Sequence, residues 1–235
     1  MSAAEILAEL KSQGNAGYKK TMLNHGAKEP IFGVKIEYLK KIQKRVKKDY
    51  QLALDLYDSG VSDAMYLAGL IADDMKMTRK DLQKWVAKAN SSMHCNYTVA
   101  WVAAGSQHGW ELANEWIESA KENVAAAGWA TLASLVAIKE DEELNIPALR
   151  KLLKRVQKTI HDSPDGVRYV MNTFVISVGS AVKELHEVAI QTARQIGAVS
   201  VDMGDTCCKV PDAEEYIGKV AKRGAIGKKR KSAKC

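Results

Sequence analysis

Apolar residues recur every three or four positions along most of the chain, which is the spacing of amphipathic α-helices. The clearest examples are the segments 35–48 and 147–161, each with one apolar face and one basic face. The segment 124–138 differs because it carries no charged residue and is rich in Ala and Leu. Such a composition predicts a helix that is buried on most of its sides.

The helical segments recur as hairpins, with starts near positions 78, 109, 147 and 181. This spacing of roughly 30–40 residues is typical of helical-hairpin arrays. Each hairpin combines an amphipathic outer helix, a tight turn and a more apolar inner helix. Arrays of this kind stack into a superhelix whose inner helices line a concave face. We therefore predict an all-α fold, a curved α-solenoid of HEAT-like helical hairpins, with residues 1–218 forming one domain.

Composition narrows the class of protein further. The chain has 235 residues, enough for a large core, and only 4 Pro and 16 Gly. It contains no apolar run long enough to span a bilayer and no signal-peptide pattern, so we expect a cytoplasmic protein. Its 4 Cys show no CxxC or zinc-ligand spacing with the His residues. We expect reduced cysteines, no metal and no cofactor.

The formal net charge of +7 is unevenly placed. Eight basic residues and no acidic ones lie in 219–235, which we predict to be a flexible basic tail. The helix 35–48 carries seven basic residues against Glu37 alone, which favours a phosphate-facing surface over a merely solvated one. Candidate contacts to a DNA backbone are Lys40, Lys44, Arg45, Lys151, Lys154, Arg155, Lys228, Lys229 and Arg230.

The Phe32-Gly33-Val34 turn leads into the basic helix, and the regular hairpins follow from 78 to 180. In these features the chain resembles the bacterial DNA alkylation repair family of AlkD-like HEAT-repeat DNA glycosylases. The resemblance covers most of the chain and implies a nucleoid-associated protein that binds double-stranded DNA, damaged or branched. It also implies removal of cationic alkylated purines, a reaction in which a carboxylate and aromatic faces stabilise the developing sugar cation.

The residues at the positions implied by the resemblance differ from the family's catalytic set. The family's carboxylate position reads Thr98, and its tryptophan position reads Met93 or His94. Its Arg would lie in 124–138, which holds no Arg, and its later Trp falls near Thr173. The sequence therefore predicts a DNA-binding member of the family that contacts the DNA backbone at a concave basic face and has little or no glycosylase activity.

Five residues on the predicted inner helices are candidates for contact with DNA on the concave face. Trp129 is either a core filler or a platform for a ligand, and Tyr97 has an aromatic ring with a hydroxyl group. Arg168 and Asn172 share one helical face, as a phosphate clamp or as part of a structural ion pair. The complete set is Tyr97, Thr98, Trp129, Arg168 and Asn172.

Two alternatives remain open at the level of the sequence. The first is an active alkylpurine glycosylase with relocated catalytic residues, for which Asp202 and Asp205 are the candidates, although capping of a turn is the more common role of such Asp residues. The second is a HEAT-like scaffold that binds protein, with an incidental basic tail.

Overall fold

The computed structural model describes residues 1–204, 206 and 208–234, and in them the secondary structure consists of helices without strands. The α-helices are α1 (Ala3–Ser12), α2 (Ala16–Asn24), α3 (Ile36–Val46), α4 (Tyr50–Asp58), α5 (Ser62–Ile71), α6 (Arg79–Lys88), α7 (Ala100–Gly105), α8 (Gly109–Trp116), α9 (Glu122–Ile138), α10 (Ile146–Thr159), α11 (Asp165–Ala181), α12 (His186–Ile196) and α13 (Ala213–Lys222). A π-helix, η2 (His94–Val99), leads directly into α7, and short 3-10 turns are η1 (Asp74–Lys76), η3 (Asp141–Glu143), η4 (Ile160–Asp162) and η5 (Lys183–Leu185).

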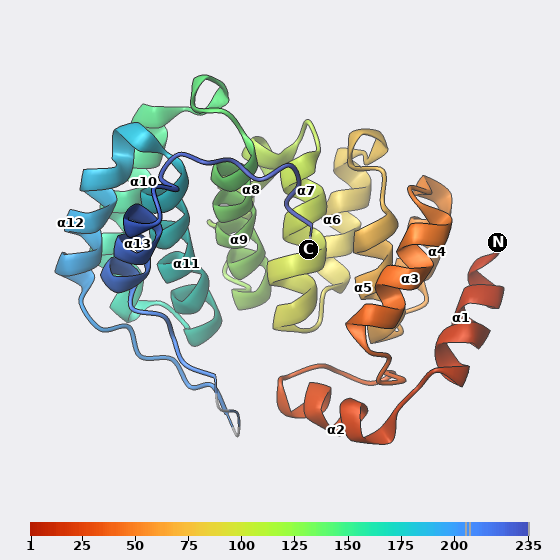
Figure 1. Ribbon diagram of the computed structural model, residues 1–235. Helices are drawn as coiled ribbons and strands as arrows, with labels where there is room; N and C mark the ends of the chain where they lie inside the picture. The colour runs from red at the N-terminus through yellow and green to blue at the C-terminus, as the bar shows by residue number, and fades with distance from the viewer. Residues whose placement is uncertain (205, 207, 235) are drawn as a thin grey trace.

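The helices follow one another in an arc from the N-terminus to α12 (Figure 1). Helices α5, α7, α9 and α11 form the inner row, and α9 packs most closely against α11 and α8. The predicted HEAT-like α-solenoid is therefore confirmed. None of the helices in the described part of the chain is long and apolar enough to cross a membrane.

Helix α9 joins the two halves of the hydrophobic core. Ala127 and Leu135 belong to the N-terminal cluster of buried residues, whereas Leu132 and Val136 belong to the C-terminal one. A Cβ added to Gly128 would lie 2.8 Å from the backbone nitrogen of Ile117, so a larger residue would push α8 away. The small, apolar composition of α9 thus allows close packing on several sides, as the sequence predicts.

Two details of the predicted helices are wrong. The helix expected to start near 181 begins only at His186, because α11 continues to Ala181. Val182 between them adopts an extended conformation that ends α11. The hairpin pattern also predicts one continuous α-helix at 92–104. The structure instead shows a π-helix followed by α7, which changes the directions in which the side chains point.

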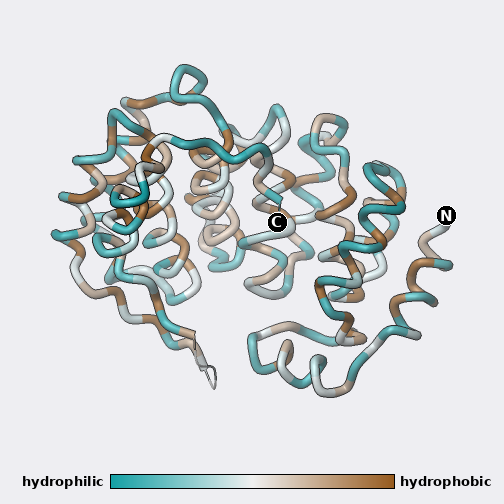
Figure 2. The backbone as a smooth tube through the Cα atoms, viewed as in Figure 1, coloured by the Kyte–Doolittle hydropathy of each residue, from teal (hydrophilic) through white to brown (hydrophobic). Residues whose placement is uncertain are grey.

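The basic tail lies against the inner helices in the structure. Lys219 and Lys222 belong to α13, and the following segment crosses α11, α9 and α7 (Figure 1). This crossing segment is largely hydrophilic (Figure 2). The backbone N–H of Arg230 donates to the Ala137 carbonyl at 2.8 Å, and Lys234 Nζ donates to the Ala72 carbonyl at 2.8 Å. These contacts differ from the flexible arrangement that the composition of the tail predicts.

Candidate nucleic-acid interface

A cleft of about 170 Å³ lies on the inner helices, and we call it the concave cleft. Helices η2 and α7 form one wall, α9 forms the floor, α11 forms the other wall, and the basic tail adds Arg230. The lining combines aromatic rings, hydroxyl groups and one guanidinium. Its residues are Asn96, Tyr97, Trp101, Ala130, Ala133, Ser134, Ala137, Tyr169, Val170, Thr173, Ser177 and Arg230.

Of the five predicted contact residues on the inner helices, Tyr97 is the one that lines the concave cleft. Its side chain is 43% exposed, and its ring lies 5.4 Å from that of Trp101, between ring centroids. Trp101 is buried and also makes an edge contact with Tyr66. The indole therefore supports Tyr97 from below, and Tyr97 presents an aromatic surface to the cleft.

His94 fixes the start of the π-helix that carries Tyr97. The buried imidazole lies 3.0 Å from Ser91 Oγ through Nδ1 and 3.2 Å from the Ser62 carbonyl through Nε2. Burial lowers the pKa of His94, so the ring is neutral near pH 7. Its role is to tie η2 to α5, and π-helical turns of this kind frequently occur at functional sites.

Thr98 does not face the concave cleft, contrary to expectation. It is fully buried and packs on Gly69 of α5, where an added Cβ would lie 2.8 Å from Thr98 Cγ2. The π-helix turns this position toward the neighbouring helix. A carboxylate here would be buried against α5, so the position aligned with the family's Asp could not serve the cleft even with an acidic residue.

Trp129 is a core residue and not a platform for a ligand. It is 1% exposed, its ring makes an edge contact with Phe174 at a centroid distance of 5.3 Å, and the Arg155 guanidinium lies over it at 5.8 Å. The interpretation as a core filler is the correct one, because α10 and α11 cover both sides of the indole.

Arg168 and Asn172 hold the segment that follows α12. Arg168 donates to the carbonyls of Ser200 and Ser163, both at 2.8 Å, and forms an ion pair with Asp165. Asn172 is fully buried and donates from Nδ2 to the Pro211 carbonyl at 2.8 Å. The structural interpretation is therefore correct for Arg168, and the buried Asn172 has no surface for a phosphate.

Asp202 also acts within the protein. Its Oδ1 accepts a hydrogen bond from the backbone N–H of Gly204 at 2.8 Å, which is the usual role of Asp at a turn. It does not line the concave cleft. Asp205, the other candidate for a relocated acid, lies outside the described residues.

Three of the nine basic candidates are compensated by nearby carboxylates. Arg45 pairs with Glu9, and its hydrogen bond lowers the pKa of that carboxyl group. Arg155 pairs with Glu118 and donates to the Ile117 carbonyl at 3.2 Å.

The third, Lys229, has a side chain that is only 7% exposed and lies 2.7 Å from Asp141 Oδ1. It also donates to the carbonyls of Val136 and Ala181, so its ammonium group is committed inside the protein and not to a DNA backbone. Within the described residues the following basic candidates form no salt bridge: Lys40, Lys44, Lys151, Lys154, Lys228 and Arg230.

Sequence reasoning missed Tyr169 and the contribution of Arg230 to the cleft. Tyr169 lies one helical turn before Thr173 on α11, so the position expected to match the family's later Trp marks the correct helical face. The contact of Arg230 with the inner helices has no local signal in the sequence. Among the described residues, no group of three or more His, Cys, Asp or Glu side chains could hold a metal ion.

Together, the superhelix and its cleft define a HEAT-like α-solenoid with an aromatic, cationic concave site. Its lining contains no carboxylate among the residues that the structure describes. Residues 6–213 match the family described as DNA alkylation repair enzyme. The chain belongs to this family, as the resemblance in the sequence indicates.

Relatives of similar length support this assignment. An uncharacterised protein of Listeria innocua is 34% identical over 93% of this chain and 97% of its own. A counterpart in Listeria monocytogenes is 33% identical over the same shares. A solved structure superposes with a TM-score of 0.91 at 34% identity and covers 100% of both chains. That protein is described as one of a new family related to the HEAT-like repeat DNA glycosylases with affinity for branched DNA structures.

Proposed function

We propose that this protein binds branched DNA through its concave side and does not excise alkylated bases efficiently. The observation that carries this proposal is the lining of the concave cleft, which among the described residues offers aromatic and cationic groups but no Asp or Glu. The protein acts in the cytoplasm at the nucleoid. It needs neither a metal nor a small-molecule cofactor for this role.

Binding of DNA is supported by the charge on the concave side and by the structural neighbour. Arg230 lines the cleft, and lysines without a salt bridge in the described part of the chain line a second hollow between the end of α3 and the tail. Cations in such positions neutralise phosphates and release counterions, which gives affinity without dependence on base sequence. The affinity of the structurally similar protein for branched DNA favours junctions over linear duplex as the ligand.

The weak excision follows from electrostatics. Departure of a base leaves positive charge on the sugar, and a preorganised group that stabilises such charge contributes on the order of a hundredfold or more in rate. The described lining of the cleft instead offers the Arg230 guanidinium, whose positive charge would oppose a developing cation. A cationic alkylpurine is already a good leaving group, so any residual reaction would be slow rather than zero.

Binding can be tested with dye-labelled DNA and fluorescence anisotropy. We expect the protein to bind a four-way junction more tightly than a linear duplex of the same sequence, with an affinity that falls steeply with salt. Equal affinity for the two, or an affinity that does not depend on salt, would contradict the proposal.

Excision needs a separate assay on methylated duplex DNA, in which released N3- and N7-methylpurines are measured. We expect release close to the rate without enzyme. Efficient release that is lost in Asp202→Asn would instead support a glycosylase with relocated residues.

A further inference from the structure

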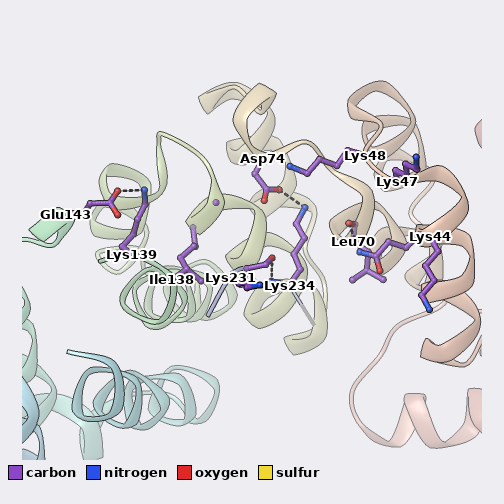
Figure 3. A pocket seen from close by; sticks show the side chains of 15 residues that line it. Lys44, Lys47, Lys48, Leu70, Asp74, Ile138, Lys139, Glu143, Lys231 and Lys234 are labelled. Carbon is purple, nitrogen blue, oxygen red and sulfur yellow. Dashed lines mark hydrogen bonds and ion pairs between the residues drawn. The ribbon is translucent and has the colours of Figure 1, made fainter. Parts of the chain in front are cut away.

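A second hollow, larger than the concave cleft, lies between the end of α3 and the basic tail. Its volume is about 810 Å³, and we call it the lysine groove. Lysines from three elements surround it: the end of α3, the end of α9 and the tail (Figure 3). They are Lys44, Lys47, Lys48, Lys139, Lys231 and Lys234.

Most of this positive charge is uncompensated. Lys234 pairs with Asp74 at 2.6 Å and Lys139 pairs with Glu143 at 2.8 Å, which accounts for both carboxylates in the lining. The other lysines of the groove form no salt bridge in the described part of the chain. Four ammonium groups around one hollow repel each other, so the groove gains stability from an anionic ligand.

The backbone at the end of α3 adopts a strained conformation next to the lysine groove. Lys47 has a φ of 64°, a value that a long side chain rarely adopts and that costs on the order of 1 kcal/mol. Among the described residues, Lys47 is the one residue other than glycine that has a positive φ. The strain ends α3 abruptly and brings Lys47 and Lys48 to the groove, where neither forms a salt bridge with a described residue. The charge of Lys48 nevertheless acts on nearby Asp74.

The tail forms one wall of the groove and is held there by two lysines whose side chains are largely covered. Lys234 Nζ contacts Asp74 and donates to the Ala72 carbonyl at the end of α5. Lys229 Nζ contacts Asp141 and donates to carbonyls at the ends of α9 and α11. Cations are favoured at the ends of helices because the carbonyls there are unsatisfied. These four side chains fix the tail, and with it Lys231.

Gly105 makes room for this attachment. A Cβ at Gly105 would lie 2.4 Å from Asp74 Oδ2, so any larger residue would displace the carboxylate. Asp74 is largely buried, and its burial raises the pKa of the carboxyl group against the opposing effect of Lys234. A buried carboxylate of this kind needs a cationic partner, and its pairing with Lys234 holds the tail against α5.

We propose that the lysine groove binds the phosphate backbone of one arm of a branched DNA, next to the concave cleft. Asp74 and Asp141 are positioning residues for this site, because they hold the tail that supplies Lys231. This inference rests on the proposed function, the binding of branched DNA. It assigns separate surfaces to separate parts of a junction, whereas a linear duplex would occupy fewer of the groove's cations.

The sharpest test is the removal of a negative charge. Asp74→Asn makes the protein more positive, so a simple charge effect would increase its affinity for DNA. If Asp74 positions the tail, the variant instead binds a labelled four-way junction about tenfold more weakly, because Lys231 is no longer held in the groove. In a Lys231→Ala background the same substitution no longer lowers affinity, since the group that it positions is already absent.

Glu187→Gln is the matched control, because it also removes one acid, which is 79% exposed and does not line the groove. It is expected to leave junction binding unchanged or slightly tighter. Circular dichroism and a thermal unfolding curve for each variant establish that it is folded. Tighter binding by Asp74→Asn in both backgrounds would overturn the inference.

The two proposals fail separately. If the wild-type protein binds junctions but Asp74→Asn and Lys231→Ala both bind as the wild type does, the groove is not a DNA site and the proposed function stands. If the wild-type protein binds neither junction nor duplex, the proposed function fails, and the inference that rests on it fails as well.

Discussion

Helices α3 and α10 show the same pattern in the sequence but differ in what their charges do. Both carry one apolar face and one basic face, and both are interpreted from the sequence as phosphate-facing. In the structure, the end of α3 borders the lysine groove with Lys44 and Lys47 unpaired. No residue of α10 lines the groove or the concave cleft, and Arg155 is held by Glu118 and stacked on Trp129.

The difference shows that an amphipathic pattern predicts which face of a helix is exposed, but not which side of the molecule that face is on. Helix α10 covers α11 and α12 from outside the arc, so its lysines project away from the inner row. Helix α3 packs on α5, and its last turn reaches the side on which the tail lies. The position of a helix in the solenoid decides whether its charges meet a ligand.

The largest effect should come from reversing the charges on each helix. Replacement of Lys44, Lys47 and Lys48 by Glu should weaken junction binding by roughly a hundredfold or more at low salt, because three phosphate contacts are lost and become repulsive. The matched variant with Glu at Lys151, Lys154 and Lys158 should change affinity by about threefold at most. Fluorescence anisotropy measures both, and equal losses would show that the two helices do not differ.

A smaller effect distinguishes the two helices by stability. Arg155→Ala should lower the free energy of unfolding by about 1–2 kcal/mol, since it removes a cation–π contact and a hydrogen bond to a backbone carbonyl. The exposed part of its ion pair adds little. Lys44→Ala should change stability by less than about 0.5 kcal/mol. Urea denaturation tests this, and a stability loss in Lys44→Ala as large as that in Arg155→Ala would mean that Lys44 has a structural role.

A substitution at the strained end of α3 should increase stability, in contrast to the loss expected for Arg155→Ala. Lys47→Gly should raise the free energy of unfolding by up to about 1 kcal/mol, because Gly adopts a positive φ without steric cost, and should weaken junction binding several-fold. Lys48→Gly is the control, as it removes the same charge where φ is ordinary and should therefore not stabilise the protein. Equal stability changes in the two variants would argue against strain at Lys47.

The smallest effect concerns the side of α3 that faces the protein. Hydrogen bonds from Arg45 and Tyr38 lower the pKa of Glu9, so this carboxyl group binds its proton less readily in the folded state. Its stabilising contribution is complete above the unfolded pKa and is lost as pH falls through the folded one. Glu9→Gln should flatten that part of the stability profile below about pH 4.5, and an unchanged profile would contradict this assignment.

The inner row of the fold could be predicted because it depends on local pattern. The uncharged stretch of α9 is stable only when it packs between other helices. The spacing of the hairpins predicts the solenoid. The contact residues were harder to predict because η2 departs from the α-helical period. Each extra residue in a π-turn rotates the following side chains by about 100°. The resemblance places Thr98 on the concave face, whereas in this chain the π-helix turns it toward Gly69 of α5.

The arrangement of the tail lay beyond any local argument. Its composition is that of a disordered segment, and its partners, Asp74 and the carbonyls at the helix ends, are distant in the sequence. The pairing of Lys234 with Ala72 joins positions 162 residues apart. Only the assembled solenoid brings the ends of α5, α9 and α11 close enough for one short segment to reach all three.

That segment changes how the solenoid should unfold. In an open array each repeat contacts only its neighbours, so the end repeats fray independently. Here the contacts of Lys229 and Lys234 join α5 to α11 directly, which makes the array behave more like a closed ring. Hydrogen exchange in α5 and α11 should therefore slow and accelerate together, and rupture of the Lys234–Asp74 pair should restore the independent fraying of an open array.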